Sequence, residues 1–156
     1  MPALQTGLSL SGRLLLGGAA GLLATLVMDL AMRRLPEGTT PPFVAAGVLS
    51  DESLSGASGR LATAVHYLAG TASGLVFVTL ALAAESLLGL SPIPSFVAAA
   101  ILQLPVTVAF FSYLVVPVYG RVPADRVARV RRDWAVSATV YVAALTVLVA
   151  APVLVA

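Results

Sequence analysis

The sequence GGAAGLLATLVMD, residues 17–29, places Gly17, Gly21, Thr25 and Asp29 four residues apart in an otherwise apolar run. At helical spacing these four side chains lie on one face of a helix, small at one end and charged at the other. The pattern predicts a membrane helix that packs closely against a second helix through this face.

A second apolar run carries a matching stripe, formed by Ala62, His66, Gly70 and Gly74. If the two helices are antiparallel, Asp29 and His66 lie at the same depth, and we expect them to contact each other. Glycine pairs allow two helix backbones to approach closely, either within one chain or between two copies in a homo-oligomer. The predicted helix-packing residues are Gly17, Gly21, Gly70 and Gly74.

The composition of the chain indicates a membrane protein. Of its 156 residues, 59% are hydrophobic and 10% are charged, and the mean hydropathy is +0.99. Charged residues make up about a quarter of a typical soluble domain. The chain is therefore too apolar for that class, and the bilayer is its expected partner.

Four apolar runs are long enough to cross a bilayer, which takes about 20 residues. We expect an all-α integral membrane protein, a four-transmembrane-helix bundle in a single membrane domain, residues 1–156, after a short tail at residues 1–12. A cleaved signal peptide is the alternative for the first run, but the length of that run and the lack of a basic residue before Arg13 argue against it. The predicted spans are residues 14–32, 61–84, 93–118 and 134–156.

The two halves of the chain share a short likeness. Residues 34–36 (RLP) follow the first run much as residues 121–123 (RVP) follow the third. This predicts two parallel helical-hairpin repeats, related by an axis along the membrane normal.

The arginines predict the orientation of the chain in the cell membrane. Eight of the nine flank the first or third connection, and the remaining one is Arg13. By the positive-inside rule, loops 33–60 and 119–133 are cytoplasmic, and the N and C termini lie outside.

The third connection is also predicted to be a basic surface. Such a surface attracts anionic lipid headgroups or an acidic protein partner. Nucleic acid is not an expected partner, because aromatic and basic residues do not alternate as they do in nucleic-acid-binding segments. The arginines concerned are Arg121, Arg126, Arg129, Arg131 and Arg132.

The first connection, residues 35–59, contains prolines that are expected to break any helix, at positions 36, 41 and 42. Residues 43–49 form an apolar patch within it. We expect a proline-stiffened loop with an anchoring patch; a gate or docking element over the level of Asp29 and His66 is the alternative.

Polar residues inside the spans are candidates for a site, because an ionisable group there costs about 2.5 to 3.5 kcal/mol. Asp29 has two expected partners, Arg33 one turn away or His66 on the second helix. Gln103 is expected either to line a polar path or to hydrogen-bond to a neighbouring helix. Glu85 is expected to be a solvated helix end. The candidate intramembrane polar residues are Asp29, His66, Gln103, Tyr113 and Tyr141.

Catalytic and metal-binding motifs are missing from the sequence. With one histidine and no cysteine, the chain cannot build a typical zinc, haem or iron–sulfur site. Phosphate-binding glycine loops and a serine nucleophile motif are also missing. We therefore expect no metal, no cofactor and no enzymatic activity.

The segment MDLAMRRLPEGTTPPFVAAGVLS, residues 28–50, resembles small uncharacterised multi-span membrane proteins encoded by halophilic archaea. The resemblance mainly covers the first two spans. It implies a membrane location and no particular activity.

Two functions fit these features. The preferred one is a non-enzymatic membrane subunit or scaffold, supported by the glycine stripes, the sparse polar interior and the basic loop. The alternative is a small oligomeric transporter or channel for protons, ions or a small solute that uses Asp29, His66 and Gln103. The two differ in whether these side chains face one common cavity or separate helix contacts.

Overall fold

The computed structural model describes residues 8–119 and 121–155. In this part of the chain every regular element is helical. Residues 1–7 of the predicted tail lie outside the described ranges, whereas residues 10–12 form the first turn of α1. The elements are α1 (Leu10–Met32), α2 (Thr40–Ser50), α3 (Gly59–Leu88), α4 (Pro92–Ala109), the π-helix η2 (Phe110–Tyr119) and α5 (Ala124–Leu154).

Four helical segments are long and apolar enough to cross a membrane: α1, α3, residues 92–117 of α4 and η2, and α5. This confirms the predicted all-helical class and the four candidate spans. Large apolar side chains on their outer faces are strongly exposed, which suits a lipid environment. Examples are Leu15 at 74%, Leu68 at 71%, Ile101 at 70% and Val147 at 67% exposure.

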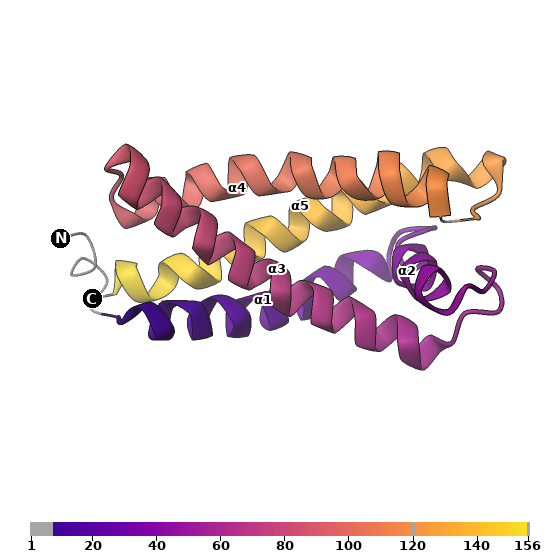
Figure 1. Ribbon diagram of the computed structural model, residues 1–156, viewed down its shortest axis with the longest axis horizontal. Helices are drawn as coiled ribbons and strands as arrows, with labels where there is room; N and C mark the ends of the chain where they lie inside the picture. The colour runs from indigo at the N-terminus through magenta and orange to yellow at the C-terminus, as the bar shows by residue number, and fades with distance from the viewer. Residues whose placement is uncertain (1–7, 120, 156) are drawn as a thin grey trace.

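Each of the four long helices packs mainly against two of the other three. α1 and α4 lie at opposite edges, and each packs against both α3 and α5 (Figure 1). α1 begins and α5 ends at the same end of the structure, and the short helix α2 lies at the other end (Figure 1). The division into two helical-hairpin repeats stays a prediction.

Of the three apolar clusters among the described residues, two contain most of the buried apolar side chains. The larger one joins the four long helices around Phe77, Phe96 and Leu145. The second joins α2, η2 and the start of α5 around Val44, Phe111, Val116 and Val130. The second cluster fixes the end of the molecule where α2 lies.

The start of α5 corrects a predicted boundary. We expected a loop at residues 119–133, but the helix begins at Ala124. Val130 is fully buried in the second apolar cluster, and Val127 packs against that cluster from the same face of the helix. The charged side chains of residues 124–133 therefore lie on an amphipathic helix rather than on a loop.

The prolines of the first connection also behave differently from the prediction. Pro41 and Pro42 lie in the first turn of α2, so the expectation that they prevent a helix is wrong. The first turn is the part of a helix where the missing N–H of proline costs least. The apolar patch at residues 43–49 is consequently helical.

Proline also explains a contact at η2. In a π-helix each carbonyl accepts from the N–H five residues later, and for Ser112 that residue is Pro117, which has no N–H. The carbonyl of Ser112 instead accepts a hydrogen bond from Nε of Arg131 at 2.8 Å. This bond joins η2 to α5.

Candidate functional site

The structure places the predicted helix-packing glycines at the contact between α1 and α3. A Cβ atom added to Gly21 would lie 2.6 Å from the carbonyl oxygen of Gly70, and one added to Gly17 would lie 2.8 Å from that of Gly74. Neither distance leaves room for a side chain. The two backbones therefore touch because these positions are glycine.

Thr25 completes this interface. Its hydroxyl donates to the carbonyl oxygen of Gly21 at 2.8 Å, and the side chain is fully buried. A Cβ atom on Gly70 would collide with the Thr25 hydroxyl. The threonine therefore fits against α3 only because position 70 lacks a side chain.

About two turns after Gly21 on α1, the structure brings Asp29 together with His66 of α3, as expected. Nε2 of His66 lies 2.8 Å from one carboxylate oxygen of Asp29. The hydroxyl of Tyr67 donates to the other oxygen at 2.5 Å. When the carboxylate is ionised it only accepts hydrogen bonds, and both neighbours then act as donors to it.

Asp29 thus takes its partners from α3 rather than from its own helix. Among the described residues its ion pair is with His66, and none is formed with Arg33. The side chains of Asp29 and His66 are 18% and 12% exposed. The cluster is therefore largely shielded, and losing one partner would leave a poorly solvated polar group.

Tyr67 is not among the residues that the sequence predicted for this site, although its hydroxyl bonds to Asp29. It follows His66 directly on α3, and the two rings meet edge to face with centroids 5.4 Å apart. A tyrosine next to the predicted partner of a carboxylate was the available signal.

Gln103 makes a separate contact, between α4 and α3. Its side-chain nitrogen donates to Ser73, to the hydroxyl at 2.7 Å and to the carbonyl oxygen at 3.2 Å. Its side-chain oxygen is buried and has no hydrogen-bond partner in the described part of the chain. Gln103 therefore joins two helices and is not a neighbour of the Asp29 carboxylate.

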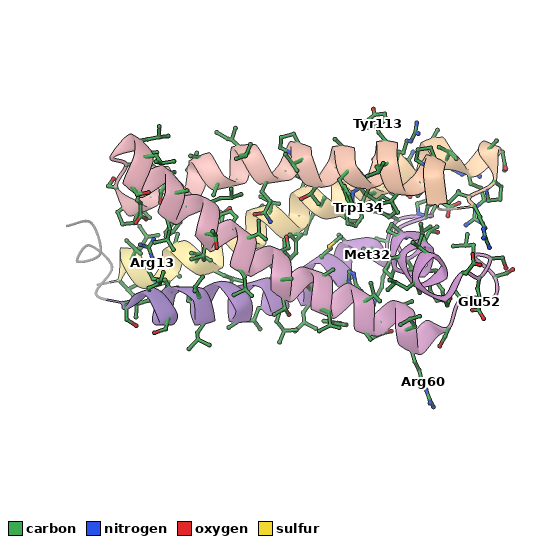
Figure 2. All side chains as sticks on the ribbon, in the orientation of Figure 1. Arg13, Met32, Glu52, Arg60, Tyr113 and Trp134 are labelled. Atoms are coloured by element: carbon green, nitrogen blue, oxygen red, sulfur yellow. The ribbon has the colours of Figure 1, made fainter. Side chains whose placement is uncertain are left out.

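Tyr141 makes a third contact, between α5 and α3. Its hydroxyl donates to the carbonyl oxygen of Gly70 at 2.6 Å. Tyr113, by contrast, is 69% exposed and lies on the outer side of η2 (Figure 2). Its ring faces the guanidinium of Arg131, 5.1 Å from the ring centroid. The five candidates therefore do not form one site.

Helix α3 carries a polar contact at three successive turns. His66 contacts α1, the Gly70 carbonyl contacts α5, and Ser73 contacts α4. Each of the other long helices is thus joined to α3 by at least one of these hydrogen bonds.

A fourth contact corrects the expectation for Glu85. Rather than a solvated helix end, Glu85 is 5% exposed and accepts two hydrogen bonds from Arg13, at 2.6 and 2.7 Å. Ser95 of α4 donates to the same carboxylate at 2.9 Å. The available signal was a pair of opposite charges near the same ends of two adjacent antiparallel helices.

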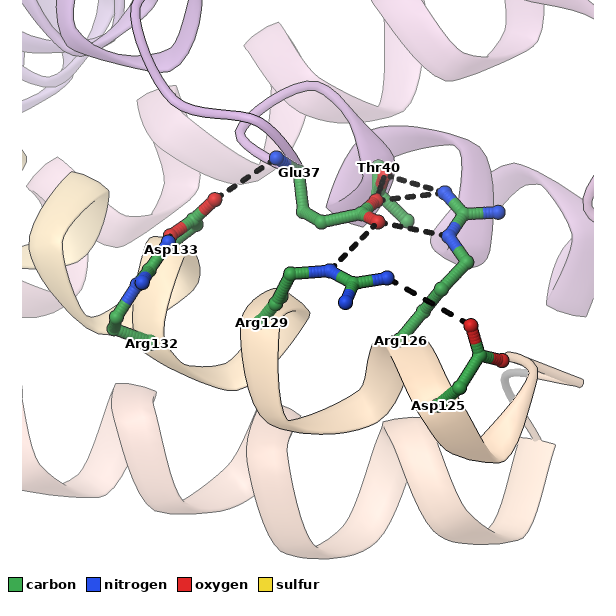
Figure 3. A network of polar contacts seen from close by, with 7 residues as sticks. All are labelled: Glu37, Thr40, Asp125, Arg126, Arg129, Arg132 and Asp133. Atoms are coloured by element: carbon green, nitrogen blue, oxygen red, sulfur yellow. Dashed lines mark hydrogen bonds and ion pairs between the residues drawn. The ribbon is translucent and has the colours of Figure 1, made fainter.

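The opposite end of the structure holds a larger charged network around Glu37 (Figure 3). Arg126 donates to both carboxylate oxygens of Glu37, at 2.8 and 2.6 Å, and Thr40 donates to one of them at 2.6 Å. The hydrogen bond from Arg126 is the main cause that lowers the pKa of Glu37 from 4.5 to about 2. Glu37 is therefore ionised across the physiological range.

Asp133 extends this network. It is fully buried, and its carboxylate accepts from the backbone N–H of Glu37 and from Nε of Arg132, both at 2.8 Å. The first connection is thereby fastened to α5. Neither acid was recognised in the sequence, because both lie in segments predicted to be loops.

The predicted basic surface is consequently only partly available. Arg126 pairs with Glu37, Arg132 with Asp133, and Arg131 with the Ser112 carbonyl. Arg129 lies 3.7 Å from Asp125 and 3.9 Å from Glu37. Arg121 pairs with Asp51 at an exposed position. Most of these arginines therefore serve the fold as well as the surface.

Metal-binding groups can be assessed for the residues that the structure covers. Within residues 8–119 and 121–155, no three or more His, Asp or Glu residues cluster as they would to hold a metal ion.

No protein-family model, curated protein or solved structure matches this chain. Its function is therefore argued from its own geometry.

Proposed function

We propose that the chain is a multi-pass membrane protein with a non-enzymatic role, as a membrane subunit or scaffold. The observation that carries this proposal is the use of polar side chains and one backbone carbonyl along α3. His66, Gly70 and Ser73 each contact a different long helix. Polar groups that hydrogen-bond between helices stabilise the fold and are not free to line a path for a substrate. This favours a structural role.

We also propose that the end containing α2 is cytoplasmic and that both termini lie outside, in the cell membrane. The distribution of arginines supports this orientation, since eight of nine flank the two connections at that end. The chain has no cysteine, so single cysteines can be introduced at Ser55 and, separately, at Ser91. An impermeant thiol reagent applied to intact cells should label position 91 and leave position 55 unlabelled; the reverse pattern would refute the orientation.

A transport function is the alternative, and two observations favour it. Asp29, His66 and Tyr67 form a hydrogen-bonded chain of three ionisable side chains. The side-chain oxygen of Gln103 is buried and has no hydrogen-bond partner among the residues that the structure describes. Such groups occur along proton and ion paths. A dimer or higher oligomer would be needed, since four helices seldom enclose a pore.

Reconstitution into liposomes separates the two functions. Vesicles carrying the protein should dissipate an imposed proton or potassium gradient no faster than empty vesicles. If the protein is a scaffold, a partner should also co-purify with it at a fixed stoichiometry after mild solubilisation of its native membrane. A gradient that is dissipated by the parent and by Arg60→Gln, but not by Asp29→Asn, would establish transport instead.

A further inference from the structure

An open groove of about 450 Å³ lies between the start of α2, residues 53–55 and the start of α5. A volume of this size is within the range of small-molecule sites. Among the described residues, none that lines the groove carries a carboxylate. The polar lining residues are Thr39, Thr40, Ser53, Ser55, Arg121 and Arg126.

The groove has hydrogen-bond donors that the fold does not use. Arg126 donates to Glu37 through Nε and Nη2, and Figure 3 shows its third nitrogen directed away from that carboxylate. Thr39 precedes α2 without making a side-chain capping bond. The hydroxyls of Ser53 and Ser55 are 3.2 Å apart, so one of their two protons is left for another acceptor. These unused donors could bind the oxygen atoms of an anion.

The electrostatic potential at the groove also favours an anion. Thr39 and Pro123 immediately precede α2 and α5, so the positive ends of two helix dipoles adjoin the groove. Glu37 offsets part of the Arg126 charge from the buried side. Among the residues that the structure describes, Arg121 bonds to Asp51, in a pair whose side chains are 57% and 89% exposed. An exposed pair of this kind is weak, so Arg121 can exchange Asp51 for a ligand at little cost.

We propose that this groove binds a phosphate-bearing anion, supplied by the headgroup of an anionic phospholipid. Arg121 and Arg126 provide the guanidinium groups that recognise phosphate oxygens. Phe43 and Leu54 also line the groove and provide apolar contacts for the glycerol and acyl portion. The lipid source rests on the proposed membrane function, whereas recognition of phosphate rests on the groove alone.

The experiment measures lipid binding to the purified protein in neutral detergent by native mass spectrometry. The probes are phosphatidylglycerol, phosphatidylcholine and soluble sn-glycerol 3-phosphate. The variants are Arg121→Gln and Thr39→Val. Arg60→Gln is the matched control, because Arg60 is exposed and points away from the helices (Figure 2).

Phosphatidylglycerol should bind more tightly than phosphatidylcholine. Arg121→Gln should weaken phosphatidylglycerol binding roughly fivefold, the effect of one arginine near an anionic headgroup, and Thr39→Val should weaken it less. Arg60→Gln should leave it unchanged.

Competition by soluble glycerol phosphate, with the same dependence on Arg121, would support the phosphate site and assign it a soluble ligand. Equal binding of the two lipids would overturn the proposal, as would equal losses in Arg121→Gln and Arg60→Gln. The liposome flux measurement does not involve this groove, so either proposal can fail alone.

Discussion

The Arg13–Glu85 and Arg121–Asp51 pairs have the same nitrogen–oxygen distance, 2.6 Å, in opposite surroundings. The first pair is 6% and 5% exposed, and the second is 57% and 89% exposed. Exposed pairs contribute about 0 to 1 kcal/mol, whereas removing one partner of a buried pair costs about 3 to 5 kcal/mol. Burial, and not distance, therefore ranks the ion pairs of this protein.

Two further pairs fall between these limits. Glu37 is buried while its partner Arg126 is one-third exposed. Asp29 and His66 are both partly buried. The four pairs form a series in which the effect of removing one partner should decrease.

The largest loss is expected for Glu85→Ala, which leaves the Arg13 guanidinium buried without a counter-ion. The free energy of unfolding, measured by titration with SDS in mixed micelles, should fall by about 3 to 5 kcal/mol. The double variant Arg13→Met with Glu85→Leu should recover most of this loss, because no charge is then left unpaired. A double variant as unstable as the single one would show that the pair itself is the source of stability.

Removing Glu37 should have the next largest effect. Glu37→Gln removes the charge-assisted hydrogen bonds with Arg126 and should cost about 2 to 3 kcal/mol at pH 7. The pKa of Glu37 is about 2 in the folded protein and 4.5 ordinarily. Its contribution is therefore complete above pH 4.5 and is lost progressively as the pH falls from 4.5 towards 2.

The pH dependence of this contribution gives a separate measurement. The difference in unfolding free energy between the parent and Glu37→Gln should shrink across that range. A difference that stays constant from pH 7 to pH 3 would contradict the lowered pKa.

At the α1–α3 interface, Asp29→Asn should cost about 1 to 2 kcal/mol. The amide keeps one acceptor oxygen but turns an N–H₂ group towards a donor, either His66 or Tyr67. Tyr67→Phe removes a single hydrogen bond and should cost about 1 kcal/mol. If Asn at position 29 were as stable as the parent while Phe at position 67 was not, the carboxylate charge would have no part in holding the helices together.

The smallest effect is expected for Asp51→Asn. Its pair with Arg121 lies in water, so the free energy of unfolding should change by less than about 0.5 kcal/mol. The same titration with SDS measures it. A loss comparable with that of Glu85→Ala would break the ranking by burial.

Sequence patterns predicted the interactions that depend on helical periodicity. Asp29 and His66 could be aligned because each lies at a fixed number of turns from a glycine on its own helix, Gly21 and Gly74. The expected contact follows from that spacing once the two helices are antiparallel.

The remaining interactions depend on how distant segments pack. Arg13 lies 72 positions from Glu85, and Glu37 lies 89 positions from Arg126. Each pair joins segments whose individual sequences resemble ordinary polar helix ends or loops. The helical start of α5 was missed for a related reason, because Val127 and Val130 gain their apolar surroundings only when α2 and η2 are in place.

The buried Arg13–Glu85 pair also has a consequence for biosynthesis. Seventy-two positions separate the two residues, and at about 5 to 20 residues per second translation needs about 4 to 14 seconds to reach the second one. Throughout that interval the nascent α1 segment carries a guanidinium without its carboxylate. If insertion accompanies translation, Arg13 must be solvated by water or lipid headgroups until Glu85 of α3 arrives. The order of synthesis would thus become an order of assembly.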